Sequence, residues 1–182
     1  MYKFVFRHLF VKLDAEWVHR RAIDWLAFWG RFGVARQAVS RIVRRGEPTF
    51  TWPLPRPNFD PDLSGTEFRT YGPLGLAAGM DKEARAVAMW DALGFGFMEI
   101  GTITPLPQPG NNRPRLWRIP QQRALRNAMG FNNEGARVAA RRLRRWRAEY
   151  GERIIIGANI GKNKVTPVSY THLRAHETLR YL

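Results

Sequence analysis

Two short apolar runs, each ending in small residues, most constrain how this chain can fold. The first covers residues 75–82 (GLAAGMDK) and the second covers residues 156–163 (IGANIGKN). Each is typical of a buried strand that stops at Gly or Ala and is followed by a polar or basic residue. Because Gly and Ala carry no bulky side chain, a flat ligand can lie against the backbone at such a strand end. The two runs favour a sheet that holds a flat cofactor, and a flavin is the cofactor that we expect.

Strand and helix patterns alternate after residue 65, as in proteins built from parallel βα units. The apolar pattern predicts strands over 68–71, 75–78, 97–101 and 154–159, and helices over 82–93 and 133–150. Asn132 and Asn133 are expected to cap the second helix. Residues 102–132 are rich in proline, so we expect a long loop with at most short helical pieces. The carboxyl ends of the strands are the candidate ligand-binding face, as in α/β barrels.

The net charge of +15, from 30 basic and 15 acidic residues, invites a polyanionic partner such as nucleic acid or an anionic membrane. The densest basic run lies within 136–150, where apolar residues recur at helical spacing: Ala136, Ala139, Ala140, Leu143, Trp146 and Tyr150. This pattern predicts an amphipathic surface helix with a solvated arginine face. It lacks the interleaved exposed aromatic residues of nucleic-acid-binding surfaces, so we expect no nucleic-acid partner. A non-enzymatic basic module for membranes or nucleic acid stays open as an alternative, on charge alone.

The chain contains no cysteine and four histidines, which excludes several kinds of site. Without Cys there is no disulfide, no thiolate nucleophile and no cysteine-based zinc or iron–sulfur site. Only His172 and His176 lie at helical spacing, in a segment that we interpret below as non-native, so we expect no metal. The run 157–162 fails the spacing of a phosphate-binding loop, because three residues instead of four separate its glycines.

The first 47 residues form a basic segment that is unusually rich in tryptophan. Apolar residues recur at helical spacing, first as Phe4, Val5, Leu9, Phe10 and Leu13 and then as Trp17, Val18, Ile23, Trp25, Leu26, Phe28 and Trp29. Basic amphipathic helices suit a membrane interface, although packing as an ordinary cap on the rest of the protein would give the same pattern. No apolar run is long enough to span a bilayer. Residues 48–65, rich in Pro, Asn and Asp over 53–63, are interpreted as a linker to the next domain.

Four segments, in order, resemble the first half of a quinone-dependent (class 2) dihydroorotate dehydrogenase: 73–82 (PLGLAAGMDK), 99–111 (EIGTITPLPQPGN), 127–133 (NAMGFNN) and 159–163 (NIGKN). The likeness covers residues 1–167, and the helical lead matches the extension that distinguishes the membrane-bound class. It implies an α/β fold in which the N-terminal part of a TIM (β/α)8 barrel, about three of its eight units, occupies 66–167. A small helical membrane-associating domain precedes it at 1–47. A soluble class 1 enzyme stays open as the closer alternative, and the helical lead argues against it.

The resemblance implies oxidation of (S)-dihydroorotate to orotate through FMN, with a membrane quinone as electron acceptor, in de novo pyrimidine biosynthesis. It implies a monomer on the cytoplasmic face of a bacterial inner membrane, attached through its N-terminal helices. The residues that match the family's FMN-contacting positions are Ala78, Gly79, Met80, Asp81, Lys82, Thr102 and Asn159. Those that match its substrate-binding positions are Lys82, Asn127, Ala128, Met129, Gly130 and Phe131.

The chemistry of these residue types fits the implied roles. The Lys82 ammonium can stabilise negative charge on a reduced flavin or on the orotate carboxylate, although a lysine at a helix start can also be a plain surface residue. The Asn127 amide can donate to and accept from a pyrimidine edge, and Gly130 allows close approach. Thr102 can donate a hydroxyl hydrogen bond, or it can reflect only β propensity.

The likeness ends at Pro167. Family members continue through a stretch that carries the catalytic serine, so we assign no catalytic residue and expect this chain alone to be inactive. Residues 168–182 follow no family pattern and are interpreted as a non-native tail.

Overall fold

The computed structural model describes residues 6, 10–43, 50–53, 67–70, 72–151 and 154–167. Phe4, Val5 and Leu9, most of the expected linker and the expected non-native tail lie outside these residues. In chain order the elements are η1 (Phe10–Lys12), α2 (Ala15–Trp29), α3 (Gly33–Val43), β1 (Phe50–Pro53), β2 (Glu67–Thr70), β3 (Gly75–Leu76), α4 (Val87–Ala92), β4 (Phe97–Ile103), β5 (Leu116–Ile119), η3 (Pro120–Gln122), β6 (Ala124–Asn127), α5 (Ala136–Tyr150) and β7 (Ile155–Ile160).

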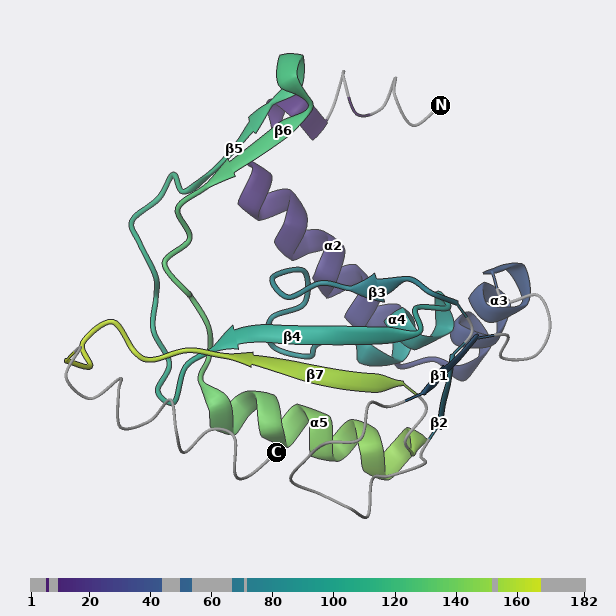
Figure 1. Ribbon diagram of the computed structural model, residues 1–182. Helices are drawn as coiled ribbons and strands as arrows, with labels where there is room; N and C mark the ends of the chain where they lie inside the picture. The colour runs from purple at the N-terminus through teal and green to yellow at the C-terminus, as the bar shows by residue number, and fades with distance from the viewer. Residues whose placement is uncertain are drawn as a thin grey trace.

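A parallel three-stranded sheet forms the centre of the structure, in the order β3-β4-β7 (Figure 1). Met98 and Ile100 on β4 are almost fully buried on the face that packs against α4 and α5. The register pairs Gly101 with Asn159, so the carboxyl ends of β4 and β7 meet at one edge of the sheet. The alternation of strand and helix in the sequence is confirmed as a parallel α/β arrangement.

Two predicted boundaries in the first βα unit are wrong. Strand β3 ends at Leu76, and the helix predicted from residue 82 begins only at Val87. The Asp81 carboxylate accepts hydrogen bonds from the backbone N–H groups of Arg85 and Ala86, at 2.9 and 2.7 Å. These bonds hold residues 81–86 in turns, and a helix cannot form until they end.

The segment predicted as a loop over 102–132 contains an antiparallel hairpin, β5 and β6, which the sequence pattern does not predict. A second unpredicted strand, β1, lies inside the expected linker and pairs antiparallel with β2. Strands of four residues give too few alternations for a period-2 pattern to stand out, so the sequence predicts neither the hairpin nor β1.

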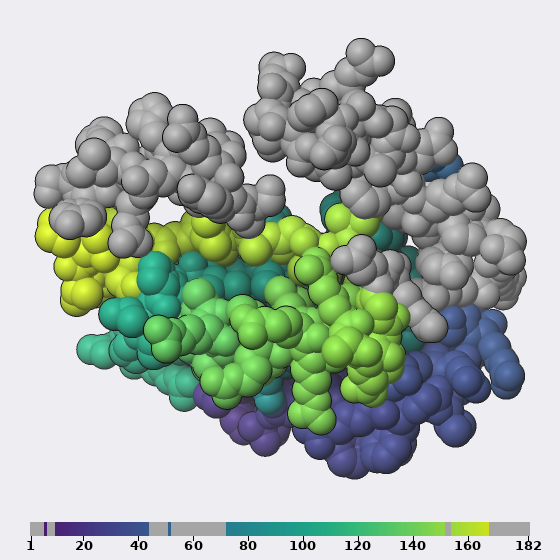
Figure 2. All heavy atoms as spheres, turned by 90° about the horizontal axis from the view of Figure 1, so that it is seen from below, coloured from purple at the N-terminus to yellow at the C-terminus, as the bar shows by residue number. Residues whose placement is uncertain are grey.

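Helices α2 and α3 pack on the sheet domain through a mixed interface. Ile23 is buried in the common core, and Leu26 packs against it. Arg85 pairs with Asp24, and Arg36 donates to the Tyr150 hydroxyl at 3.2 Å while its guanidinium lies over the Tyr150 ring. Figure 2 shows α5 (green) at the surface beside the N-terminal helices (purple and blue). None of the helices among the described residues is long and apolar enough to cross a membrane.

Helix α5 confirms the predicted amphipathic helix with some differences in its apolar stripe. Ala139 and Trp146 are buried, and Leu143 and Tyr150 pack partly against the core. Ala136 and Ala140, predicted for the same stripe, are exposed among the arginines.

Candidate functional site

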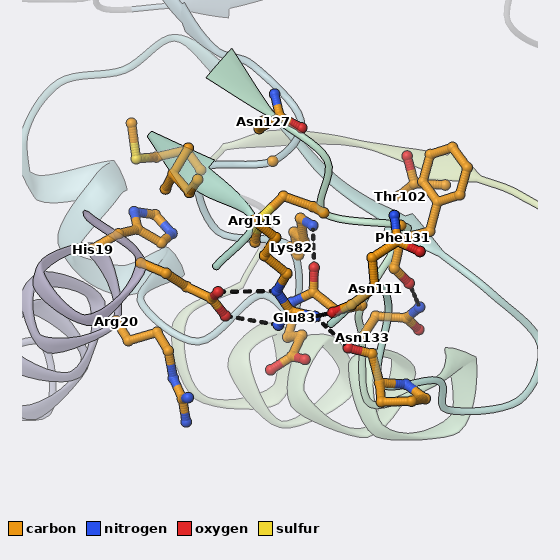
Figure 3. Close-up of a pocket in the computed structure, with 18 of the residues that line it drawn as sticks. His19, Arg20, Lys82, Glu83, Thr102, Asn111, Arg115, Asn127, Phe131 and Asn133 are labelled. Carbon is orange, nitrogen blue, oxygen red and sulfur yellow. Dashed lines mark hydrogen bonds and ion pairs between the residues drawn. The ribbon is translucent and has the colours of Figure 1, made fainter. Parts of the chain in front are cut away.

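A cavity of about 810 Å³ lies between α2, the end of β3, the end of β4 and the two chain segments that lead into and out of the β5–β6 hairpin (Figure 3). Its size is typical of a small-molecule or cofactor site. Every predicted site residue except Asn159 lines it: Ala78, Gly79, Met80, Asp81, Lys82, Thr102, Asn127, Ala128, Met129, Gly130 and Phe131. Segments far apart in the sequence thus converge on one cavity.

Lys82 presents a half-buried positive charge to this cavity. Its Nζ donates a hydrogen bond to Asn132 Oδ1 at 3.0 Å, and its backbone carbonyl accepts from the Gly101 N–H at 2.9 Å. Burial lowers the pKa of Lys82 from its ordinary value, and the nearby Arg115 charge lowers it further. A buried ammonium is stabilised when an anion comes to lie beside it, so this position favours a ligand that carries negative charge.

Asp81 shapes the loop that presents Lys82. Its side chain is only 2% exposed, and its Oδ2 also accepts a hydrogen bond from Trp90 Nε1 at 3.1 Å. The carboxylate oxygens are engaged with Trp90 and with the backbone after β3. A ligand in the cavity would therefore meet the backbone of this residue rather than its carboxylate.

The backbone around Gly79 leaves room for a flat group, as the small residues predicted. Gly79 has φ +98°, and a Cβ built on it would meet nothing within 4 Å. Its N–H donates to the Gly101 carbonyl at 2.8 Å, which fixes the loop after β3 to the end of β4. The open space above Gly79 and the Lys82 cation at the same strand end fit a planar, electron-accepting cofactor such as a flavin.

Thr102 and Asn159 form a pair at the ends of β4 and β7. The Thr102 hydroxyl donates to Asn159 Oδ1 at 2.6 Å, and Asn159 Nδ2 donates to Glu99 Oε1 at 3.1 Å. Thr102 lines the cavity, whereas Asn159 does not. Among the described residues, Asn159 therefore orients the hydroxyl group of Thr102.

The predicted substrate segment 127–131 is paired with the segment before the hairpin. The Asn111 N–H donates to the Met129 carbonyl at 3.1 Å, and Asn111 Nδ2 donates to the Ala128 carbonyl at 2.9 Å. Gly130 has φ +71°, and a Cβ there would lie 2.8 Å from the Asn111 nitrogen, so the approach requires glycine. The Asn127 side-chain amide makes no hydrogen bond to any other described residue. It is therefore available to a ligand.

The expectation that Asn132 and Asn133 cap α5 is wrong. The N-cap residue is Gly135, which has no side chain to supply the bond. Asn132 instead accepts from Lys82, and the buried Asn133 joins its own segment, residues 131–135, to Thr104 at the end of β4. Its Oδ1 accepts from the Gly135 N–H at 2.8 Å, and its Nδ2 donates to Thr104 Oγ1 at 2.9 Å and to the Phe131 carbonyl at 2.7 Å. Both residues line the cavity.

Replacing Asn133 with alanine is expected to lower the free energy of unfolding by about 2–3 kcal/mol, because buried donors and acceptors at the end of β4 lose their partner. Urea denaturation measures the change. The exposed Asn112 supplies the matched control, and Asn112→Ala should leave the unfolding free energy within about 0.5 kcal/mol of the parent protein. Equal effects of the two substitutions would show that Asn133 does not hold these segments together.

One wall of the cavity could not be predicted from the motifs. Helix α2 contributes Glu16, His19, Arg20 and Ile23 to the lining. Burial lowers the pKa of His19, while the Asp81 carboxylate acts in the opposite direction. No sequence pattern marks His19 as a site residue, because it lies on a helix outside the strand-end motifs.

The buried Glu16 pairs with two arginines from the segment before the hairpin. Its Oε1 lies 2.7 Å from Arg115 Nη2 and 3.0 Å from Arg113 Nη2. The hydrogen bond from Arg115 lowers the pKa of Glu16, so the carboxylate is charged in the folded protein. The ion pair fixes α2 to the chain that forms the far side of the cavity.

Comparisons with known proteins place these features in context. A family model described as dihydroorotate dehydrogenase matches residues 61–177. A dihydroorotate dehydrogenase (quinone) of Thermus thermophilus is 43% identical over 100% of this chain and 48% of its own length. The enzyme of the same name from Mycolicibacterium smegmatis is 46% identical over 92% of this chain and 43% of its own length.

Solved structures show the same likeness. The crystal structure of dihydroorotate dehydrogenase from Eimeria tenella in complex with ferulenol matches with a TM-score of 0.63 and 33% identity, over 90% of this chain and 39% of that one. The ligand-free form of the Eimeria tenella protein matches with a TM-score of 0.52 and 37% identity, over 78% of this chain and 40% of that one. The chain spans about half the length of the curated relatives that it matches.

Proposed function

The chain belongs to the dihydroorotate dehydrogenase family, and on that premise we propose that it forms the flavin- and substrate-binding part of a quinone-dependent enzyme. The proposed reaction is oxidation of (S)-dihydroorotate to orotate in de novo pyrimidine biosynthesis, with FMN as the flavin. One observation carries the proposal: the Lys82 cation, the open backbone at Gly79 and the side-chain amide of Asn127 line the same cavity. The names of the relatives favour a quinone acceptor over the soluble class.

The sheet suits the beginning of a (β/α)8 barrel, about three of its eight units. Helices α4 and α5 cover the face of the sheet that carries Met98 and Ile100. Phe97, which points to the opposite face, is exposed, and β7 has only β4 as a neighbour among the described residues. In a closed barrel that opposite face lies inside and both edges are paired.

Each residue of the cavity can be given a role in holding the reactants. When bound, FMN would take a hydride from the substrate and pass electrons on to the quinone. The backbone at Ala78 and Gly79 would hold the flat ring. Lys82 would pair with the orotate carboxylate or with negative charge that develops during the reaction. The Asn127 amide would bind the pyrimidine edge.

An enzyme of this kind needs access for a membrane quinone, and α2 suits that role. One face of α2 lines the cavity with His19 and Ile23. Another region of the helix exposes aromatic rings in mostly edge-to-face contact, among them Trp25 (62% exposed) and Phe28 (48% exposed). Trp29 and, just after the helix, Phe32 complete the cluster. Exposed aromatic side chains among basic residues suit a lipid headgroup layer. We propose peripheral attachment of a monomer to the cytoplasmic face of a bacterial membrane.

Replacing Trp25 and Phe28 together by serine should weaken binding to vesicles of anionic phospholipid about tenfold or more, because two aromatic rings no longer enter the interface. Co-sedimentation with the vesicles measures the bound fraction. Val165→Ser, which removes an even more exposed apolar side chain (86% exposed) elsewhere, should leave binding unchanged. Unaltered vesicle binding by the double variant would exclude this face as the attachment surface.

The proposed activity is tested with the protein expressed from the complete source gene. We expect dihydroorotate-dependent reduction of a soluble quinone analogue. Turnover with fumarate or NAD but not with the quinone analogue would assign the protein to the soluble class instead. A protein that oxidises dihydroorotate with none of these acceptors would contradict the proposal.

A further inference from the structure

Arg115 connects three parts of the chain. It binds Glu16 on α2, the segment 109–111 before the hairpin and Ala128 after it. Its side chain is 6% exposed, as is that of Glu16. The guanidinium binds the Glu16 carboxylate in a two-pronged arrangement, with Nε to Oε2 at 2.9 Å and Nη2 to Oε1 at 2.7 Å. This fork geometry fixes both the distance and the orientation of α2 relative to the segment before the hairpin.

The remaining contacts of Arg115 reach the segment that carries the candidate substrate residues. Its Nη1 donates to the carbonyls of Pro109 and Asn111, at 2.6 and 2.8 Å. Its own backbone carbonyl accepts from the Ala128 N–H at 2.9 Å. Asn111, held in this way, in turn binds Ala128 and Met129. A continuous set of bonds therefore connects Glu16 on α2 to Ala128 and Met129.

The same ion pair acts electrostatically on Lys82. The Arg115 charge lowers the pKa of Lys82, whereas the Glu16 charge raises it. Glu83 also raises it, and His19 on α2 faces the same ammonium. Because Glu16 and Arg115 carry opposite charges at one place, their effects on the pKa of Lys82 oppose each other while the pair is intact.

We propose that Glu16 and Arg115 act as positioning residues, which hold residues 127–131 in place for substrate and shield Lys82 from an unbalanced charge. Helix α2, on the proposed quinone side of the cavity, is thereby coupled to the substrate side. This inference rests on the proposed function for its consequences in binding. Its structural part, the hold of α2 on residues 127–131, stands without any ligand.

The test compares Glu16→Gln with Asp24→Asn, an acid-to-amide change on the same helix that breaks the exposed pair with Arg85. In the ligand-free protein, Glu16→Gln should accelerate hydrogen exchange of the Ala128 and Asn111 amides about tenfold or more, whereas Asp24→Asn should not. Glu16→Gln should also raise the Kd for orotate about tenfold, because the substrate segment is held less firmly. The loss of orotate binding at alkaline pH should move to a lower pH, because Arg115 without its partner lowers the pKa of Lys82 further.

Arg115→Lys separates the two effects and serves if Glu16→Gln fails to fold. It keeps the positive charge but loses the fork, so amide exchange should accelerate while the pH dependence of orotate binding stays unchanged. Unaltered exchange at Ala128 and Asn111 in both variants would overturn the inference. A parent protein that binds no orotate would remove the proposed function instead, and the exchange rates would still decide the positioning.

Discussion

Replacing Lys82 with methionine is expected to weaken orotate binding and to lower the rate of dihydroorotate oxidation, each by about a hundredfold or more. Methionine keeps the length of the side chain but removes the positive charge that Lys82 presents to the cavity. Its bond to Asn132, at 3.0 Å, would be lost as well. Titration with orotate and steady-state kinetics measure the two effects. The matched control is Lys12→Met, which changes an exposed lysine outside the cavity and should alter neither.

The pH dependence of orotate binding provides a second readout for Lys82. Burial lowers its pKa, so the ammonium loses its proton at a lower pH than an exposed lysine does. Binding of an anion that needs the charged form is fully present below that pKa and falls as the pH rises through it. In Lys82→Met this alkaline loss should disappear. A normal alkaline loss in the variant, with unchanged affinity, would exclude Lys82 as the anion-binding group.

Replacing Asp81 with alanine is expected to lower the free energy of unfolding by about 3 kcal/mol or more, the largest stability change that we predict. Three donors around the buried carboxylate, the N–H groups of Arg85 and Ala86 and the indole of Trp90, would lose their acceptor. Flavin and orotate binding should fall with it, because the same turn presents Lys82. Urea denaturation measures the stability. The control Asp24→Ala, which removes a partly exposed ion pair, should lower the free energy of unfolding by about 1 kcal/mol or less. Equal losses of unfolding free energy for the two substitutions would contradict the role given to Asp81.

The central sheet could be predicted because its signals are local. The apolar run at 97–101 corresponds to β4, and the amphipathic pattern at 133–150 corresponds to α5, which differs only in its start. The start of α4 could not be predicted, because it depends on where the Asp81 side chain points. The hairpin β5–β6 could not be predicted either, since its strands are short and proline-rich sequence surrounds them.

The candidate site also has a part that the sequence predicts and a part that it does not. Residues at strand ends, such as Gly79 and Thr102, converge because parallel strands end at one edge, so a sequence pattern can locate them. The α2 wall has no such signal. Glu16 and Arg115 lie far apart in the chain, and only the folded structure shows that one buried charge is compensated by the other. Tertiary ion pairs of this kind leave no periodic pattern in the sequence.

The most direct measurement is the visible absorption spectrum of the protein purified from the complete source gene, followed by addition of dihydroorotate without oxygen. We expect a bound flavin whose visible absorption disappears when dihydroorotate is added, and bleaching that is about a hundredfold or more slower when Lys82→Met is treated in the same way. A colourless protein that takes up no FMN, or a bound flavin that dihydroorotate does not bleach, would contradict the assignment of this cavity to flavin and dihydroorotate.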